Sequence, residues 1–308
     1  MRIAIAGGSG LIGRRLAAAL LADGHTVRVL ARNVEQAQRR VPRGAETIRW
    51  DPSGDPVAIA DALRGIDAVV NLAGESIGGR PWTPGRKRAI LESRLQATGA
   101  IVEGIERLPP GERPATLVSA SGIDAYGDRR DIELAEDGPT ADTFLARVAL
   151  AWEAAARGAE RLGVRVVLCR TSFVIATDAP AFRLLVLPSR LFLGGRLGPG
   201  DQPFTWIHVD DAVGLYALAL RDTSIAGPLN LVAPQVPPQL DVARAIGRVL
   251  GRPAAFPAPA PLLRLTLWGQ ADLLLHGRRA VPARANAAGY VFRYPTIDAA
   301  LRDALGGR

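Results

Sequence analysis

The sequence is poor in the residue types that build disulfides and metal clusters. Its 308 residues contain one cysteine, Cys169, which leaves no second thiol for an internal disulfide and suits a reducing compartment. Cys169 lies in the apolar run VRVVLCR and is expected to fill the core rather than to react. The three histidines, His25, His208 and His276, are far apart in the sequence and lack ligand spacing, so we predict no metal site.

Long apolar runs are also absent. No stretch approaches the roughly 18 uninterrupted apolar residues that a membrane span needs. The opening residues MRIAIAGGSG end in glycines and lack the cationic region and the cleavage site of a secretory signal. We therefore expect a cytoplasmic protein that does not enter a membrane.

Lysine and aromatic residues are scarce in a chain that is otherwise basic. The formal net charge is +8, yet Lys87 is the only lysine, and the arginines occur in short clusters scattered along the chain. Aromatic residues make up 5% of the chain, which is too few for a platform on which nucleic-acid bases could stack. The sequence thus favours a small-molecule substrate over nucleic acid, and it leaves a homodimer open.

The sequence does contain a regular alternation of strand-like and helix-like segments. Helical periodicity is present in the segments 11–24, 84–107 and 144–163. Short and nearly continuous apolar runs, typical of strands covered on both faces, occur at 2–7, 25–32, 45–51, 66–74, 115–121 and 164–171. This alternation predicts an α/β fold with a doubly wound parallel sheet of the Rossmann type.

The C-terminal third differs in character from the rest. It is rich in proline and mixes short strands with helices. We expect residues 1–175, with 205–232 returning to them, to form the Rossmann domain. Residues 176–308 are expected to form a smaller C-terminal α+β substrate lobe over the carboxyl edge of the sheet.

A glycine-rich turn, GGSGLIG, connects the first predicted strand to the first helix. Gly7 permits a tight turn, Gly10 lets a pyrophosphate approach the N–H groups of the helix N-terminus, and Gly13 lets the helix lie close to the sheet. In this position the pattern predicts a dinucleotide-binding loop. The residues expected to contact the dinucleotide are Gly7, Ser9, Gly10, Leu11 and Ile12.

The end of the second predicted strand carries Ala31 and Arg32 and no acidic residue. An NAD site usually places an acid here to bind the ribose 2′-OH, whereas an arginine fork suits a 2′-phosphate. Ala31 and Arg32 therefore predict NADP(H) as the cofactor in preference to NAD(H). The alternative is that Arg32 is an ordinary solvated residue in an arginine-rich chain.

Several motifs together resemble one family. The segments GGSGLIG, NLAGE, RKRAILESR, YGDR and LGPGDQPFTWIHVDD are similar to those of atypical extended short-chain dehydrogenases/reductases, in particular NAD-dependent epimerase/dehydratase-like proteins with a small conserved C-terminal domain. The resemblance extends nearly from end to end. It implies that Leu72, Ala73 and Gly74 lie along the adenosine and ribose of the cofactor, and that Arg94 faces the cofactor. Without the resemblance, Leu72 and Ala73 read as a plain strand-to-loop transition and Arg94 as a solvated helix residue.

The Tyr-x-x-x-Lys pair that most of this superfamily uses for proton transfer is absent. Counting back from Glu153, the corresponding positions hold Leu145 and Ala149, and neither side chain can titrate. The motif occurs nowhere else, because Lys87 is the only lysine and Thr83 stands four residues before it. If the protein is a catalyst, its proton-transfer groups must be other residues.

The segment SASGIDAYGD, at the end of the fifth predicted strand, holds the nearest candidates: Ser121, Asp124 and Tyr126. Asp124 and Ala125 stand where the family usually has glycine and tyrosine. A carboxylate in a partly dry cleft would have a raised pKa and could act as an acid or base, while Ser121 could bond a substrate carbonyl. The structural alternatives are an Asx turn closed by Asp124, a loop shaped by Tyr126 and a strand end capped by Ser121.

Four further side chains are predicted to contact the substrate. Glu75, Arg80 and Trp82 follow the fourth predicted strand and are expected to line the mouth of the site, and Trp206 is expected to form part of an apolar wall. The alternatives are a surface ion pair between Glu75 and Arg80, and core packing for the two tryptophans.

The segment WIHVDD, residues 206–211, precedes another predicted helix. His208 is expected to be structural rather than an acid or base. Asp210 or Asp211 is expected to cap the N-terminus of the helix.

These observations favour an NADP(H)-dependent oxidoreductase or epimerase that acts on a small organic or sugar-like substrate. A second interpretation is a non-catalytic NADP(H)-binding sensor or interaction protein, which the loss of the tyrosine–lysine pair favours. A third is a lyase or cyclase that keeps the fold but not the redox step, which the carboxylate of Asp124 would allow.

Overall fold

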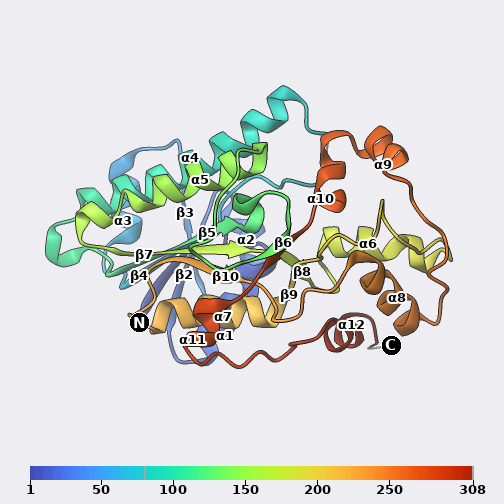
Figure 1. The fold of residues 1–308 in the computed structure, drawn as a ribbon. Helices are drawn as coiled ribbons and strands as arrows, with labels where there is room; N and C mark the ends of the chain where they lie inside the picture. The colour runs from blue at the N-terminus through green and yellow to red at the C-terminus, as the bar shows by residue number, and fades with distance from the viewer. Residues whose placement is uncertain (80, 307–308) are drawn as a thin grey trace.

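The computed structural model describes residues 1–79 and 81–306, and a seven-stranded parallel sheet forms its centre (Figure 1). The strands follow the spatial order β10 (Gly227–Leu231), β7 (Arg165–Thr171), β5 (Thr116–Gly122), β4 (Ala68–Asn71), β1 (Arg2–Ala6), β2 (Thr26–Ala31) and β3 (Glu46–Arg49). From β1 the chain first adds strands on one side and then, from β4 onward, on the other. The predicted doubly wound parallel sheet is confirmed, and the order of addition reverses beside β1, where such sheets bind ligands.

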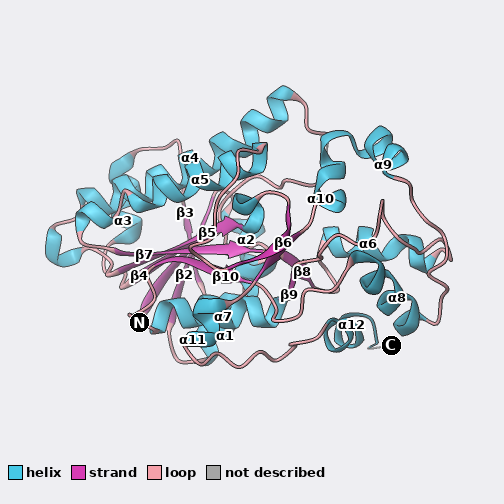
Figure 2. Ribbon diagram, viewed as in Figure 1, coloured by secondary structure: helices cyan, strands magenta, loops and turns pink. Residues whose placement is uncertain are grey.

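Helices cover both faces of the sheet (Figure 2). On the upper face of Figure 1 lie α3 (Pro56–Leu63), α4 (Pro84–Arg107) and α5 (Phe144–Arg157). On the lower face lie α1 (Leu11–Ala22), α7 (Val209–Arg221) and α11 (Ala283–Ala287). The connections carry α2 (Val34–Gln38), η1 (Pro110–Glu112), η2 (Ile123–Tyr126) and η3 (Glu160–Leu162). None of the helices formed by the described residues combines the length and the apolar character needed to cross a bilayer.

Two apolar layers hold the helices to the sheet. Ile5 and Val29 face α1 and α7 in one layer, while Val69 and Leu117 face α3, α4 and α5 in the other. All four side chains are fully buried. Burial of such a side chain contributes about 1.5–3 kcal/mol, and successive strand residues point to opposite faces, so each strand stabilises both layers.

A smaller lobe extends from the carboxyl edge of the sheet. Its elements are β8 (Phe173–Ile175), α6 (Pro180–Arg190), β9 (Trp206–His208), α8 (Gln239–Leu250), α9 (Ala260–Leu267), η4 (Trp268–Ala271), α10 (Asp272–Leu275) and α12 (Ile297–Gly306). Phe182, Ile246 and Leu301 bring α6, α8 and α12 together around a core of their own. The domain boundaries expected from the sequence stay a prediction.

Several strands outside the predicted ranges form through distant partners, among them β6 (Arg129–Leu134), β10 and β11 (Arg278–Ala280). The strand β6 pairs in parallel with β11, although its sequence RRDIEL is mostly charged and exposed. The strand β10 begins with Gly227 and Pro228, residues that usually break strands. Proline is tolerated there because β10 is an edge strand, which has no neighbour on one side.

A buried ion pair joins α5 to β7. Arg170 donates from Nε and Nη2 to the two carboxylate oxygens of Glu153, at 2.8 and 2.9 Å. The two side chains are 5% and 6% exposed, so the pair is shielded from water. Burial lowers the pKa of Arg170, but the hydrogen bonds and charge of Glu153 outweigh this and raise it overall. Arg170 therefore stays charged in the core, and the bidentate geometry fixes both side chains.

His208 caps the N-terminus of α7, in place of the expected Asp210 or Asp211. Its Nδ1 accepts from the backbone N–H of Asp210 at 3.2 Å, so its proton resides on Nε2, which lies 3.2 Å from Asp303 of α12. Asp211 points elsewhere, because its carboxylate accepts the backbone N–H groups of Arg293 and Tyr294. The histidine thus serves the structural role expected for it, by tying α12 to α7.

The first prediction concerns the pH dependence of stability. Burial lowers the pKa of His208 below the ordinary 6.5, against the opposing charges of Asp210 and Asp303. Between the lowered pKa of the folded state and the ordinary 6.5, His208 binds more protons in the unfolded chain than in the folded protein. The stability that the neutral His208 contributes is therefore complete above pH 6.5 and is lost as the pH falls toward the folded-state pKa. We expect the urea midpoint to decrease between about pH 7.5 and about pH 5. The decrease should be smaller in His208→Gln, with His25→Gln as the control; equal slopes in all three proteins would contradict this account.

The second prediction concerns the buried pair. Removal of one partner leaves an uncompensated buried charge, so Glu153→Ala should lower the free energy of unfolding by about 3–5 kcal/mol. The double variant Glu153→Met with Arg170→Met should lose much less, because both charges are removed and the volume is kept. Urea unfolding followed by circular dichroism measures both values. A double variant as unstable as the sum of its two single variants would refute the assignment.

Candidate functional site

The glycine turn between β1 and α1 brings backbone atoms unusually close together. Gly7 has φ +76°, and a Cβ on it would lie 2.8 Å from the carbonyl carbon and oxygen of Leu72. A Cβ on Gly13 would lie 2.5 Å from the carbonyl oxygen of Gly7. Any larger residue at either position would displace backbone, so the turn requires glycine.

The N-terminus of α1 is open to an anion. Gly10 is the N-cap, no side chain caps the helix, and its first turn has no acidic residue. The first N–H groups of the helix therefore lack a side-chain acceptor and carry the positive end of the helix dipole. This arrangement is typical of a phosphate-binding turn. Ser9 lies in the same turn, and Leu11 and Ile12 begin the helix. Their contact with a dinucleotide stays a prediction.

The loop after β4 is fixed by side chains that sequence analysis missed. Thr98 of α4 accepts hydrogen bonds from Asn71 Nδ2 at 2.8 Å and from Trp152 Nε1 of α5 at 2.9 Å. Asn71 in turn accepts the backbone N–H of Ala73 at 3.2 Å. The buried threonine thus ties two helices to the strand end and holds Leu72 and Ala73 against the glycine turn. The sequence feature that could have indicated this arrangement is Asn71, a polar residue at the end of an apolar run.

The end of β2 presents Arg32 to solvent. Ala31 is half-buried, and Asn33 caps α2 by accepting the backbone N–H of Gln36 at 2.9 Å. Within the described part of the chain, the Arg32 guanidinium has no hydrogen-bond or ion-pair partner. Its positive charge helps to keep the pKa of Asp51 low, after the larger effect of the Ser53 hydrogen bonds. Arg32 is thus free to bind a ligand.

An ion-pair cluster joins the smaller lobe to the first turns of α1. Asp178, which follows β8, accepts hydrogen bonds from Arg14 and from Arg15, the latter at 2.7 Å. Burial raises the pKa of Asp178, but the bonds and charges of the two arginines outweigh it and lower the pKa overall. The smaller lobe is therefore anchored beside the open helix N-terminus. The Arg14-Arg15 cluster was visible in the sequence, but its partner was not.

The three candidate acid–base residues all have partners. Ser121 donates to Glu153 at 2.7 Å and is 5% exposed. Tyr126 is fully buried, and burial raises the pKa of its phenol. Asp124 pairs with Arg278 at 2.6 Å, and the turn at Asp124 is closed by its own backbone carbonyl, so its carboxylate forms no Asx turn.

The hydroxyl of Tyr126 lies in a closed network. It accepts from Arg170 Nη1 at 2.9 Å and lies 2.8 Å from Asn230 Oδ1 and 3.0 Å from the carbonyl of Ala135, to which it can donate. Asn230 continues the network by donating to the carbonyls of Leu134 and Val281. Tyr126 therefore shapes the core beneath the strand end, which is the structural alternative considered for it.

The positions of the missing catalytic pair offer no titratable group. Leu145 is half-buried and Ala149 is buried on α5. Ser121 lies at the carboxyl end of β5, where the reaction site is expected, and it is therefore the candidate that remains. Its O–H donates a hydrogen bond to Glu153, so only its oxygen lone pairs are left to accept a further hydrogen bond.

The predicted mouth of the site is only partly as expected. Glu75 pairs with Arg86 at 2.8 Å, and Arg80 lies outside the described residues. Trp82 is half-buried, contacts Phe144 edge-to-face at a centroid distance of 5.4 Å, and lies near η4 of the smaller lobe. Trp206 is fully buried in the core of the smaller lobe, so its proposed contact with substrate is corrected to core packing.

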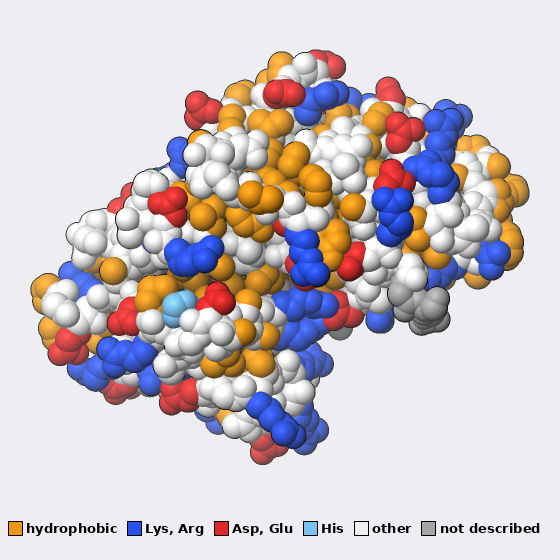
Figure 3. Space-filling view, turned by 90° about the horizontal axis from the view of Figure 1, so that it is seen from below, with side chains coloured by type: hydrophobic (Ala, Val, Ile, Leu, Met, Phe, Trp, Pro, Cys, Tyr) orange, Lys and Arg blue, Asp and Glu red, His pale blue; other side chains and the backbone are white. Residues whose placement is uncertain are grey.

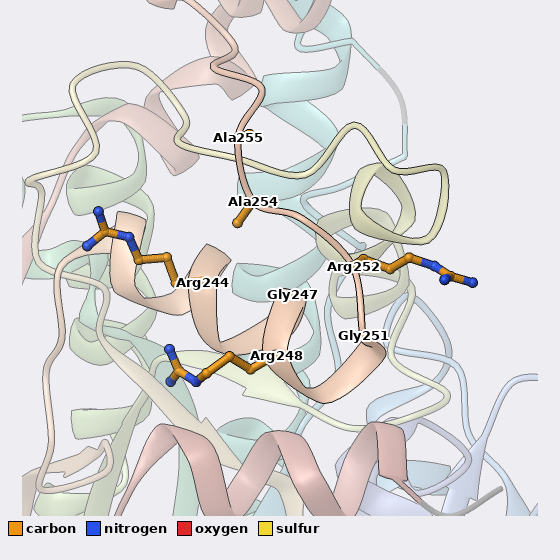
Figure 4. Close-up of a pocket in the computed structure, with 7 residues that line it drawn as sticks. All are labelled: Arg244, Gly247, Arg248, Gly251, Arg252, Ala254 and Ala255. Atoms are coloured by element: carbon orange, nitrogen blue, oxygen red, sulfur yellow. The ribbon is translucent and has the colours of Figure 1, made fainter.

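The surface offers other features that carry no comparable chemistry. A shallow hollow of about 550 Å³ on α8 is lined by Arg244, Gly247, Arg248, Gly251, Arg252, Ala254 and Ala255. Arg244 and Arg248 extend to one side and Arg252 to the other (Figure 4), and the first two pair with Asp241 and Asp298. Acidic and basic side chains are interspersed on the face shown in Figure 3. The convergent polar groups lie instead around the ends of β1, β4 and β5.

The geometry fits a dinucleotide. The glycine turn packs so closely against neighbouring backbone that a Cβ on Gly7 or Gly13 would clash, and α1 offers uncapped N–H groups for a pyrophosphate. The half-buried Ala31 and the unpartnered Arg32 stand where the ribose end would lie. Among the described residues, no group of three or more His, Cys, Asp or Glu side chains is arranged to hold a metal ion.

Comparison with known proteins agrees with this geometry. Residues 3–231 match the model of the NAD dependent epimerase/dehydratase family, and residues 258–304 match a domain of unknown function (DUF1731). The epimerase family protein YfhF of Bacillus subtilis is 34% identical, over 100% of this chain and 99% of its own. The chloroplastic SDR39U1 homolog of Arabidopsis thaliana, also described as an epimerase family protein, is 36% identical over 98% of this chain and 86% of its own.

A solved structure is similar over its whole length. The crystal structure of human epimerase family protein SDR39U1 (isoform 2) with NADPH has a TM-score of 0.86 and 33% identity, and the match covers 100% of both chains. The family resemblance drawn from the motifs is confirmed. This chain is a member of the NAD-dependent epimerase/dehydratase family and is similar to the SDR39U1 proteins within it.

Proposed function

We propose that the protein binds NADP(H) across the ends of β1, β2 and β4. The observation that carries this proposal is the glycine turn at an uncapped helix N-terminus, with the unpartnered Arg32 at the end of the next strand. The NADPH in the human SDR39U1 structure, a relative similar over the full length, supports the same cofactor. A guanidinium fork matches a phosphate better than a ribose hydroxyl, which favours NADP(H) over NAD(H).

Each part of the cofactor has protein groups suited to hold it. The N–H groups at Ser9, Leu11 and Ile12 suit the pyrophosphate, and Arg32 suits the 2′-phosphate. Leu72 and Ala73 offer a fixed backbone edge, because Asn71 and Thr98 hold them in place. Gly74 adds a surface without a side chain. A bound nicotinamide would supply or accept a hydride.

The reaction that we propose is oxidoreduction or epimerisation of a small organic or sugar-like molecule. Ser121 stands at the end of β5, where its oxygen can accept a hydrogen bond from a substrate hydroxyl while its own O–H donates to Glu153. The half-buried Trp82 lies beside the smaller lobe and offers an apolar surface for the substrate. Glu75 and Asp124 add carboxylates, each already paired with an arginine.

A second candidate is a non-catalytic NADP(H)-binding protein. The observation in its favour is that Ser121, Asp124 and Tyr126 all have partners, and that Leu145 and Ala149 replace the usual catalytic pair. The same pairing of Asp124 with Arg278 weakens the lyase or cyclase interpretation, which needs a carboxylate free to take a proton. The two leading candidates share the cofactor site and differ in turnover.

The third prediction tests the cofactor. Arg32→Ala should weaken NADPH binding by about 1.5–3 kcal/mol, because a charged hydrogen bond to the 2′-phosphate is lost. Binding of NADH, which lacks that phosphate, should change little. Isothermal titration calorimetry measures both affinities. Arg302→Ala, an exposed arginine on α12, is the matched control for the loss of one positive charge. An unchanged preference between NADPH and NADH in Arg32→Ala would refute the assignment.

The fourth prediction tests turnover. We expect the protein to transfer deuterium from NADPH labelled at nicotinamide C4 to a carbonyl compound in a panel of keto acids, ketones and keto sugars. Transfer should come from one face of the ring only, because the cofactor is held in one orientation, and mass spectrometry of the products detects it. If NADPH binds and no compound gains label from either face, the non-catalytic candidate is favoured.

A further inference from the structure

The side chain of Arg94 is held beside the loop that follows β4. Its Nη1 donates to the backbone carbonyls of Glu75 and Ile90, at 3.0 and 2.8 Å. The guanidinium carbon lies 4.9 Å from the centroid of the Trp152 ring. A Cβ on Gly74 would lie 3.1 Å from Arg94 Cγ, so this glycine lets the side chain lie flat against the loop.

The charge of Arg94 has no carboxylate partner among residues 1–79 and 81–306. Its charge interacts mainly with those of Glu75, Arg86 and Asp124. Glu75 already pairs with Arg86 at 2.8 Å, and Asp124 pairs with Arg278 at 2.6 Å. The described cluster thus contains three guanidiniums and two carboxylates, which leaves one positive charge uncompensated.

That uncompensated charge is only partly solvated. Arg94 is half-buried, and burial lowers its pKa to about 10, although Glu75 opposes the change. The side chain therefore remains protonated near neutral pH. A partly buried cation without a counter-ion is costly, and such groups are usually paired. The cost is offset if a ligand supplies the anion.

The nitrogen atoms of Arg94 that donate no hydrogen bond within the described residues suit a planar anion. Nη1 is occupied by the two carbonyls, whereas Nε and Nη2 have no acceptor within the described part of the chain. These two nitrogens form the edge of the guanidinium that can donate two parallel hydrogen bonds to a carboxylate. The cation–π contact with Trp152 and the two carbonyl bonds preorganise that edge.

We propose that Arg94 binds a carboxylate group of the substrate, so that the substrate is a small organic acid. This inference rests on the proposed function, because it concerns the substrate side of the same site. A single carboxylate would bring the net charge of the cluster to zero, whereas a doubly charged phosphate would leave an excess negative charge next to Glu75 and Asp124. The charge balance therefore selects a carboxylate over a phosphate.

The experiment is ligand-observed NMR on the full-length protein, both alone and saturated with NADP⁺. The probes are glycolate, its neutral isostere glycolamide, and inorganic phosphate, each at the same ionic strength. We expect glycolate to bind and to compete with other small carboxylates. Glycolamide and phosphate should bind at least about ten-fold more weakly, because they lack the matching charge or carry too much of it.

Two variants and a control assign the effect to the residue. Arg94→Gln should weaken glycolate binding by about ten-fold or more, the loss expected for a charged hydrogen bond. Arg94→Lys keeps the charge but not the fork and should give an intermediate loss, which keeps the test informative if the glutamine variant folds poorly. Arg88→Gln removes an exposed arginine on the same helix and should leave binding unchanged.

The affinity for NADPH in the same variants separates this proposal from the proposed function. If Arg94→Gln loses NADPH and keeps glycolate, the residue belongs to the cofactor site, as the family resemblance implies, and the proposal is overturned. Phosphate binding equal to that of glycolate would also overturn it. If the unmodified protein binds glycolate through Arg94 but does not bind NADPH, the proposed function fails and the anion site stands.

Discussion

The buried pair of Arg170 and Glu153 is the interaction on which the rest of the site depends. Arg170 also donates a hydrogen bond to the hydroxyl of Tyr126, and Glu153 also accepts a hydrogen bond from the hydroxyl of Ser121. Four elements, α5, β5, β7 and η2, therefore meet at one charged contact that water does not reach. Because both charges are paired and both groups are hydrogen-bonded, the contact specifies one arrangement of the strand end instead of several.

The second constraint is steric and acts through the backbone. The glycine turn approaches the loop after β4 so closely that a single Cβ would clash with Leu72. That loop is held in turn by Asn71 and Thr98, and Thr98 also binds Trp152. The backbone at the proposed cofactor site is thus fixed by strand ends and helices, which is how rigid scaffolds present a ligand site.

The charged cluster around Arg94 lies away from α5, the helix that carries the catalytic pair in most of the superfamily. Positions Leu145 and Ala149 of α5 are apolar, while charged groups gather on the loop after β4, on η2 and on β11. In this cluster Arg94 is the cation without a carboxylate among the described residues. This member of the family, which lacks the tyrosine–lysine pair, thus has rigid strand ends beside a preorganised positive charge.

The sequence by itself determined the sheet, the glycine turn and the family, because these depend on local features: apolar runs of strand length, glycines at required spacings and short motifs. Only the tertiary structure decided which distant residues and strands pair with one another. Asp124 and Arg278 are 154 residues apart, and no local pattern relates them. The same holds for the charged strand β6, which forms by pairing with β11, and for Trp206, whose burial follows from the packing of α6, α8 and α12 around it. Local rules act over a few residues, whereas ion pairs, edge strands and burial depend on which distant segments the fold brings together.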